Sequence, residues 1–216
     1  MKQIKQLTPS ITPGSKSLIT KLCDFSKNEK EYKLHFVDVS KRVLLKDYIF
    51  TGNNKHVLNL LLPYFTGNGS LDLNKGIYLY GSFGTGKTIM FEIIRKWLAE
   101  LFRFNQNGFY STSIEEIIEY YKKDNSFGKF GYGVDGMNMN ICINEFGKKV
   151  NEKIYGNDVN ELLNSLIMIR YELFRNQKIT HVTSNYHPEK LKLEPIIKDR
   201  IVEMFNFIEL KGESFR

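Results

Sequence analysis

The chain has 216 residues, which is the size of one domain or of one domain with an extension. Hydrophobic residues make up 42% and charged residues 25% of the sequence, a balance that excludes a largely disordered chain. No apolar run approaches the roughly 20 residues that a membrane helix needs, and the polar start predicts no signal peptide. With two distant cysteines, Cys23 and Cys142, we expect a cytoplasmic protein without a disulfide framework.

Positive charge is concentrated near the start of the chain. The net charge is +7, and residues 1–46 hold ten basic and four acidic side chains, so they contribute +6 of it. A basic segment on a nearly neutral body favours a polyanionic or acidic partner, although it is also typical of a polar extension that only keeps a chain soluble. We therefore divide the chain into residues 1–47, a basic extension or small partner-binding region, and one domain over residues 48–216.

The first elements have mixed patterns. The first fifteen residues contain Pro and Gly and are expected to form a loose lead-in, whereas residues 17–27 and 33–45 are expected to form a small N-terminal element. Apolar side chains at helical spacing predict a helix over residues 54–65, with Asn53 or Asn54 as its cap.

From residue 76 onward, strand-like and helix-like segments alternate. We expect strands over residues 76–80, 108–110, 139–143, 179–183 and 204–210, and helices over residues 88–102, 113–123, 158–174 and 195–200. Ser113 with Glu116 three residues later predicts a capping box, and the Gly-rich aromatic stretch 127–136 predicts a mobile loop. Strands separated by helices indicate an α/β fold with a mostly parallel sheet between helices.

A phosphate-binding loop is the clearest motif in the chain. Residues 81–88 match G-x-x-x-x-G-K-[ST] at every fixed position, directly after a predicted strand and before a predicted helix. In such a loop the backbone N–H groups and the helix N-terminus converge on phosphate oxygens. Lys87 is expected to contact the β- and γ-phosphates of ATP, and the Thr88 hydroxyl to bind Mg²⁺. The residues expected to form the loop are Gly81, Ser82, Phe83, Gly84, Thr85, Gly86, Lys87 and Thr88.

Polar residues also follow two later strands. Glu145 is placed to polarise the attacking water as a general base, and Asn144 takes the position on the metal side. Because an amide oxygen brings no charge, Mg²⁺ binding and hydrolysis are expected to be weaker than with a carboxylate. Asn185, with Ser184 behind it, is expected to contact the γ-phosphate. The alternatives are a strand end at Asn144 and Glu145 and a simple turn at Ser184 and Asn185.

Taken in chain order, these motifs resemble one ATPase family. The segments that carry the resemblance are residues 81–88, 141–145, 170–172, 183–185, 199–201 and 212–216. They are similar to the motifs of the DnaC/IstB-like AAA+ ATPases, which include replicative helicase loaders and the ATPase helpers of transposases. The resemblance covers roughly residues 48–216 and implies a P-loop NTPase of AAA+ type that uses ATP and Mg²⁺. The last motif ends at residue 216, the last residue of the sequence, so no separate C-terminal lid is expected.

The resemblance also implies roles for single arginines. Arg200 corresponds to the arginine finger, which reaches the γ-phosphate of ATP in a neighbouring subunit, and Arg216 to a second sensor arginine in its own subunit. A guanidinium suits this work because it is an always-charged fork of donors. Without the resemblance, Arg200 is better explained by pairing with Asp199 or as a surface charge, and Arg216 is equally explained by a frayed terminus. Arg170 is either an intersubunit contact or a charge pair on the surface of its helix.

The leading hypothesis is an ATP-dependent assembly factor that acts on DNA and resembles replicative helicase loaders. It implies a homo-oligomer with ATP, single-stranded DNA as a ligand, and a replicative helicase as partner. A transposition helper, with a transposase as partner, is the alternative within the family. Because Asn144 replaces the family's usual Asp, an ATP-binding switch or scaffold with little hydrolysis is a further hypothesis. A small-molecule kinase is disfavoured, because the later arginines stand singly and precede a strand.

An aromatic stretch is the expected site of DNA contacts. Phe127, Phe130 and Tyr132, together with Lys129, could supply stacking platforms and a phosphate contact. The alternative is a packed or disordered connector without a binding role.

Overall fold

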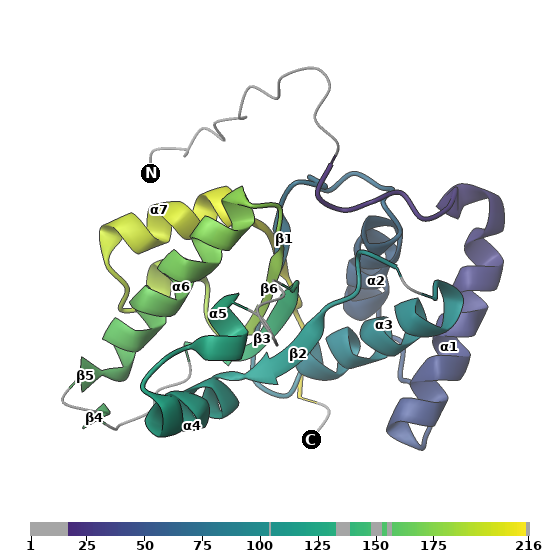
Figure 1. Ribbon diagram of the computed structural model, residues 1–216. Helices are drawn as coiled ribbons and strands as arrows, with labels where there is room; N and C mark the ends of the chain where they lie inside the picture. Colours follow the sequence, from purple (N-terminus) through teal and green to yellow (C-terminus); the bar gives the residue numbers. More distant parts are fainter. Residues whose placement is uncertain (1–16, 104, 133–138, 148–152, 155–156, 215–216) are drawn as a thin grey trace, which may run out of the picture.

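The computed structural model describes residues 17–103, 105–132, 139–147, 153–154 and 157–214 (Figure 1). The expected lead-in at the start of the chain, part of the expected loop 127–136, and Arg216 lie outside these residues.

A five-stranded sheet forms the centre of the molecule. Its strands are β1 (Gly76–Tyr80), β2 (Tyr110–Ser113), β3 (Ile141–Phe146), β6 (Thr180–Ser184) and β7 (Phe205–Glu209). They lie in the order β2-β3-β6-β1-β7, and every pair in this sheet is parallel. The predicted parallel sheet is therefore confirmed. A small antiparallel pair, β4 (Lys153–Ile154) and β5 (Asn157–Asp158), was not expected from the sequence.

Helices follow the strands in alternation. The α-helices are α1 (Glu29–Leu44), α2 (Gly52–Phe65), α3 (Lys87–Leu101), α4 (Ile114–Asp124), α5 (Gly128–Tyr132), α6 (Val159–Arg175) and α7 (Pro195–Met204), and the 3₁₀ helices are η1 (Phe25–Asn28) and η2 (Pro188–Lys190). The predicted helices from residue 88 onward are found within a few residues of their expected bounds, and the last one continues four residues further. Among the described residues, no helix is long and apolar enough to cross a bilayer.

The helices cover both faces of the sheet. In Figure 1, α1, α2 and α3 lie on one side of the sheet and α4, α5, α6 and α7 on the other. Strand β1 serves both sides, because Ile77 and Leu79 belong to one hydrophobic cluster and Tyr78 to the other. A sheet that is buried on both faces favours apolar strands, and β1 (GIYLY) and the first half of β3 (ICI) fit this pattern. Strand β6 (THVTS) and the edge strand β2 (YSTS) are largely polar.

The N-terminal segment packs against α3. Phe36 and Val39 of α1 are buried in the same cluster as α2 and α3. The Trp97 indole N–H donates to the Tyr32 carbonyl at 3.1 Å. From Ser17 onward this segment therefore shares a core with the helices around it. A separate partner-binding role for residues 1–47 stays a prediction.

Two predicted helix caps differ in detail from the structure. The N-cap of α2 is Thr51, whose hydroxyl accepts from the Asn54 N–H while the Asn54 side chain accepts from the Thr51 N–H, so neither Asn53 nor Asn54 is the cap. At α4, the Ser113 hydroxyl accepts from the Glu116 N–H as predicted, but the Glu116 carboxylate accepts from the Tyr110 and Thr112 hydroxyls, so only half of the predicted capping box is found. The sequence did not single out Thr51 as the cap, because asparagine is as common at this position as threonine and two asparagines follow it.

The aromatic stretch between α4 and β3 is a short helix in its described part, not a loop. Phe127 and Phe130 are buried, and their rings lie against those of Tyr121 and Tyr120 at centroid distances of 4.8 and 5.4 Å. Lys129 lies over the Phe130 ring. The expected stacking platforms are therefore wrong for Phe127 and Phe130, because the apolar face of α4 gives these rings a surface to bury against.

Arg170 joins several elements from within the core. It is fully buried on α6, so neither expected alternative, an intersubunit contact or a surface charge pair, is correct. Its guanidinium donates to the Thr180 hydroxyl at 2.8 Å and to the carbonyls of Phe130, Met139 and Ile179 at 3.1–3.2 Å. Burial lowers its pKa to about 10, so the group stays charged at neutral pH. Arg170 thus ties α5 to the amino ends of β3 and β6.

We expect Arg170→Met to lower the free energy of unfolding by about 2–4 kcal/mol, because it leaves several buried acceptors without donors. The matched control is Arg175→Met on the same helix, where an exposed pair with Glu172 is lost and about 0.5 kcal/mol is expected. Urea unfolding followed by circular dichroism measures both. Equal losses for the two variants would contradict the role given to Arg170.

Candidate nucleotide-binding site

The predicted site residues gather where the parallel strands end. The phosphate-binding loop follows β1, Asn144 and Glu145 lie in the second half of β3, and Asn185 follows β6. Because β3, β6 and β1 are neighbours and parallel, these segments emerge at the same edge of the sheet. Strand β1 is also the point where the chain order reverses, since β2 lies at one edge and β7 on the other side of β1. Ligands of open α/β sheets bind at this position.

Glycines shape the loop. Gly84 and Gly86 have φ of 76° and 87°, and helix α3 begins directly after Gly86. Gly81 lies so close to the end of β7 that a Cβ there would overlap the Leu210 carbonyl oxygen. Phe83, at the tip of the loop, is 64% exposed. The backbone therefore has the tight turn that the motif predicts.

Lys87 points back into the loop. Its ammonium donates to the carbonyls of Gly81 and Ser82 at 2.9 and 2.7 Å and to the Thr85 hydroxyl at 3.3 Å. Desolvation lowers its pKa to about 8, although the negative charge of Glu145 acts in the opposite direction. Lys87 and Glu145 are thus close enough to influence each other.

Asn144 is a buried amide with all its hydrogen-bonding groups engaged. Its Nδ2 donates to the Ser111 hydroxyl at 2.9 Å and to the Thr112 carbonyl at 3.0 Å. Its Oδ1 accepts from the Thr183 hydroxyl at 3.1 Å. Asn144 therefore connects β2, β3 and β6 at the base of the loop.

Glu145 occupies a strained position in β3. Its φ is 57°, a left-handed conformation that is costly for a residue with a side chain. The register with β6 shifts here, because Ile143 pairs with Val182 but Phe146 pairs with Ser184, so β3 holds one extra residue. Such a bulge re-aims a side chain at the edge of a sheet. Sequence patterns did not reveal it.

Thr183 belongs to the site but was not predicted as a functional residue. Its hydroxyl lies 3.4 Å from that of Thr88, and it also accepts from the Glu145 N–H at 3.3 Å. Threonine is common in strands, so Thr183 gave no signal of its own. Ser184, expected to stand behind Asn185, donates to the Phe146 carbonyl at 2.8 Å and so fixes the bulge.

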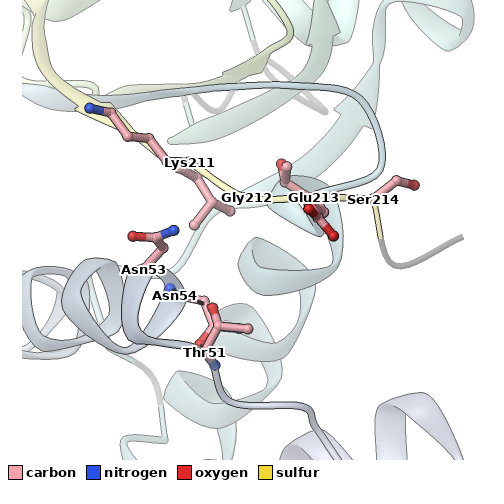
Figure 2. A pocket seen from close by; sticks show the side chains of 9 residues that line it. Thr51, Asn53, Asn54, Lys211, Gly212, Glu213 and Ser214 are labelled. Carbon is pink, nitrogen blue, oxygen red and sulfur yellow. Dashed lines mark hydrogen bonds between the residues drawn. The ribbon is translucent and has the colours of Figure 1, made fainter.

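A cavity of about 390 Å³ adjoins the loop (Figure 2). It lies between the start of α2, Thr85 of the loop and the segment after β7. The lining residues are Thr51, Asn53, Asn54, Thr85, Leu210, Lys211, Gly212, Glu213 and Ser214. These three segments are far apart in the sequence, so the cavity could not be predicted from it.

Arg200 lies on α7, not at the loop. Its guanidinium donates to the Glu203 carboxylate at 3.0 Å and to the Tyr171 hydroxyl at 3.2 Å, and it lies over the Tyr171 ring. No described contact joins Arg200 to the residues of the loop, and a role in a neighbouring subunit stays a prediction.

Comparisons with known proteins agree on the fold. No protein-family model and no curated protein matches the sequence. Among solved structures, a DnaC helicase loader superposes with a TM-score of 0.55 and 20% identity, over 84% of this chain and 99% of that one. DnaA from Aquifex aeolicus bound to AMPPCP gives a TM-score of 0.55 and 17% identity over 77% of this chain. The chain has the AAA+ P-loop fold.

The resemblance to DnaC/IstB-like ATPases is thus confirmed at the level of the fold. A replication initiator DnaA bound to AMPPCP and single-stranded DNA superposes with a TM-score of 0.56 and 17% identity, over 77% of this chain. This chain spans about half the length of the DnaA chains, covering 49% of each, and nearly all of the DnaC chain.

The lowered pKa of Lys87 predicts a pH dependence. Near pH 8 the ammonium of the free protein begins to lose its proton, whereas an anionic triphosphate in the loop would raise its pKa again. ATP binding should therefore take up a proton, and the Kd should rise by up to about tenfold per pH unit above pH 8. Calorimetry in two buffers of different ionisation enthalpy measures this uptake. Lys87→Met should bind weakly without the dependence, and a constant wild-type Kd from pH 7.5 to 9.5 would contradict the assignment.

Proposed function

We propose that this protein is an ATP-dependent assembly factor that acts on DNA, resembles replicative helicase loaders and hydrolyses ATP. The observation that carries the proposal is the meeting of the P-loop, Glu145 and Thr183 at one edge of the AAA+ sheet. The triphosphate of ATP would lie along the backbone N–H groups of the loop. It would replace the loop carbonyls as the hydrogen-bond acceptor of the Lys87 ammonium. The base and ribose would enter the cavity beside Thr85, which is the adjoining space.

The chemistry assigned to the site is hydrolysis of the γ-phosphate. Glu145 would hold the attacking water and accept its proton, and Asn185 would contact the γ-phosphate from the end of β6. The Thr88 hydroxyl fits Mg²⁺, since this cation prefers oxygen ligands. The second lone pair of the Asn144 amide oxygen would accept from a water of that ion. When bound, Mg²⁺ neutralises charge that develops on the phosphates.

Likeness to replication proteins supports action on DNA. One neighbour is a helicase loader, and another is an initiator bound to single-stranded DNA. The excess of positive charge in residues 1–46 suits the phosphate backbone of a nucleic acid. We therefore propose single-stranded DNA as a ligand and a replicative helicase as partner.

Assembly would complete the site. We propose that the protein forms a homo-oligomer with ATP and that Arg200 acts as an arginine finger on the neighbouring subunit's γ-phosphate. Arg216 is proposed as the sensor arginine of its own subunit, in line with the path of residues 210–214 along the loop.

An ATP-binding switch with little hydrolysis is the second candidate. One observation favours it, namely that Asn144 is neutral and fully hydrogen-bonded where the family has an Asp. A site without that carboxylate would bind ATP and assemble while turning over slowly.

ATP turnover by the purified protein, with and without single-stranded DNA, tests the proposal. We expect DNA-stimulated turnover that falls by about 100-fold in Lys87→Ala, because the mutant loses the cation at the phosphates. Tight ATP binding without turnover in either condition would select the switch. Absence of ATP binding, or equal binding by Lys87→Ala, would overturn both candidates.

Mixing two inactive variants tests the finger. Arg200→Ala and Lys87→Ala should each be nearly inactive alone, since a finger contributes about 10³-fold or more to turnover. A 1:1 mixture should recover about a quarter of the wild-type rate, because that share of random interfaces joins an intact loop to an intact Arg200. No recovery in an oligomer that forms normally would contradict a role in trans.

A further inference from the structure

A chain of hydrogen bonds runs beneath the phosphate-binding loop. It starts at Thr88 of the loop, passes through Thr183 of β6, and ends at Asn144 of β3. Thr183 is 1% exposed and Asn144 is 6% exposed, so protein groups rather than bulk water satisfy them.

The direction of this chain is fixed by one carbonyl. The Thr112 carbonyl can only accept a hydrogen bond, and it lies 3.0 Å from the Asn144 side chain, so the amide nitrogen must face it. The amide oxygen of Asn144 must then face Thr183. Since that oxygen can only accept, the Thr183 hydroxyl must donate to it.

The direction continues to the loop. Once its proton is committed to Asn144, the Thr183 oxygen can only accept, and it accepts from the Glu145 N–H at 3.3 Å. The Thr88 hydroxyl, 3.4 Å away, must therefore donate to Thr183. With its proton directed into the protein, the Thr88 oxygen keeps its lone pairs for a cation on the phosphate side.

We propose that Thr183 is a positioning residue for the metal side of this site, an inference that rests on the proposed function. Its hydroxyl orients the Thr88 oxygen toward Mg²⁺ and holds the backbone of Glu145 at the bulge. Asn144 is then part of this chain rather than a weakened acid. An aspartate there would place a carboxylate oxygen against the Thr112 carbonyl, where two acceptors repel.

The test replaces the Thr183 hydroxyl by a methyl group, which keeps the shape of the side chain. Thr183→Val removes the hydroxyl and with it both hydrogen bonds of the chain, and Thr183→Ser restores the hydroxyl. Each protein is titrated with Mg²⁺ in the presence of a fluorescent N-methylanthraniloyl ATP, and binding of the same nucleotide in EDTA is measured in parallel. We expect Thr183→Val to raise the half-saturating Mg²⁺ concentration by about tenfold, the scale of lost outer-shell contacts, with unchanged binding in EDTA. Thr183→Ser should stay close to wild type.

The control is Thr180→Val. Thr180 is also 1% exposed and lies in the same strand, but at its other end, where its hydroxyl accepts from Arg170. This variant should lose melting temperature without a change in its Mg²⁺ dependence. If Thr183→Val does not fold, Thr183→Cys keeps the volume with a weaker donor, and a smaller shift in the same direction is expected.

The outcomes of these titrations distinguish a failure of the proposed function from a failure of the role given to Thr183. A wild-type protein that binds the nucleotide no better than Lys87→Ala overturns the proposed function. Nucleotide binding that needs Lys87, together with an unchanged Mg²⁺ dependence in Thr183→Val and Thr183→Cys, overturns only the role of Thr183. An equal shift in Thr180→Val would do the same, because it would reduce the effect to general destabilisation.

Discussion

The candidate nucleotide site depends on how closely the end of β7 approaches the phosphate-binding loop. The Leu210 N–H donates to the Tyr80 carbonyl at 2.7 Å, which carries the pairing of β1 and β7 one residue past the sheet. The next residue, Gly81, then has no room for a side chain beside Leu210. Further along, Ser214 occupies the space that a Cβ on Gly84 would need. The segment after β7 is therefore a wall of the loop, and changes there would alter its shape.

Hydrogen bonds to the backbone at Glu145 and at the residue after it stabilise the strained conformation of Glu145. A left-handed residue with a side chain costs about 1–2 kcal/mol, and it persists only where its surroundings fix it. Here the Glu145 N–H is bound by the Thr183 hydroxyl, and the carbonyl of the next residue, Phe146, accepts from Ser184. Neighbouring hydroxyls of β6 thus stabilise the bulge that aims the proposed base. Regular pairing of β3 with β6 is therefore interrupted at Glu145, the residue proposed to activate the attacking water.

The sequence predicts β1 and β3 because each begins with a short apolar run, and it predicts the loop because its glycines and lysine have fixed spacing. Strand β2 lies at Tyr110–Ser113 rather than at the expected residues 108–110, because its residues YSTS carry no apolar pattern. Long-range contacts decide the rest. An arginine such as Arg170 normally predicts an exposed surface, and its burial depends on carbonyls that come from three distant segments. The burial of Phe127 and Phe130 depends on α4 in the same way. Thr183 looks like any strand threonine until its three partners are known.

The contacts of Arg200 within its own subunit bear on the proposed dependence of hydrolysis on assembly, because Arg200 would have to exchange them for a neighbour's γ-phosphate. Within one subunit its guanidinium is shared between Glu203 and Tyr171. Glu203 is half exposed, and an exposed ion pair of this kind contributes about 0–1 kcal/mol. A γ-phosphate offers a denser charge and room for a bidentate contact, which is the stronger interaction for a guanidinium. The intrasubunit contacts therefore position the Arg200 guanidinium at the surface of α7. Exchanging the exposed ion pair with Glu203 for a neighbour's phosphate costs little free energy. Hydrolysis would then be limited by assembly rather than by the release of Arg200.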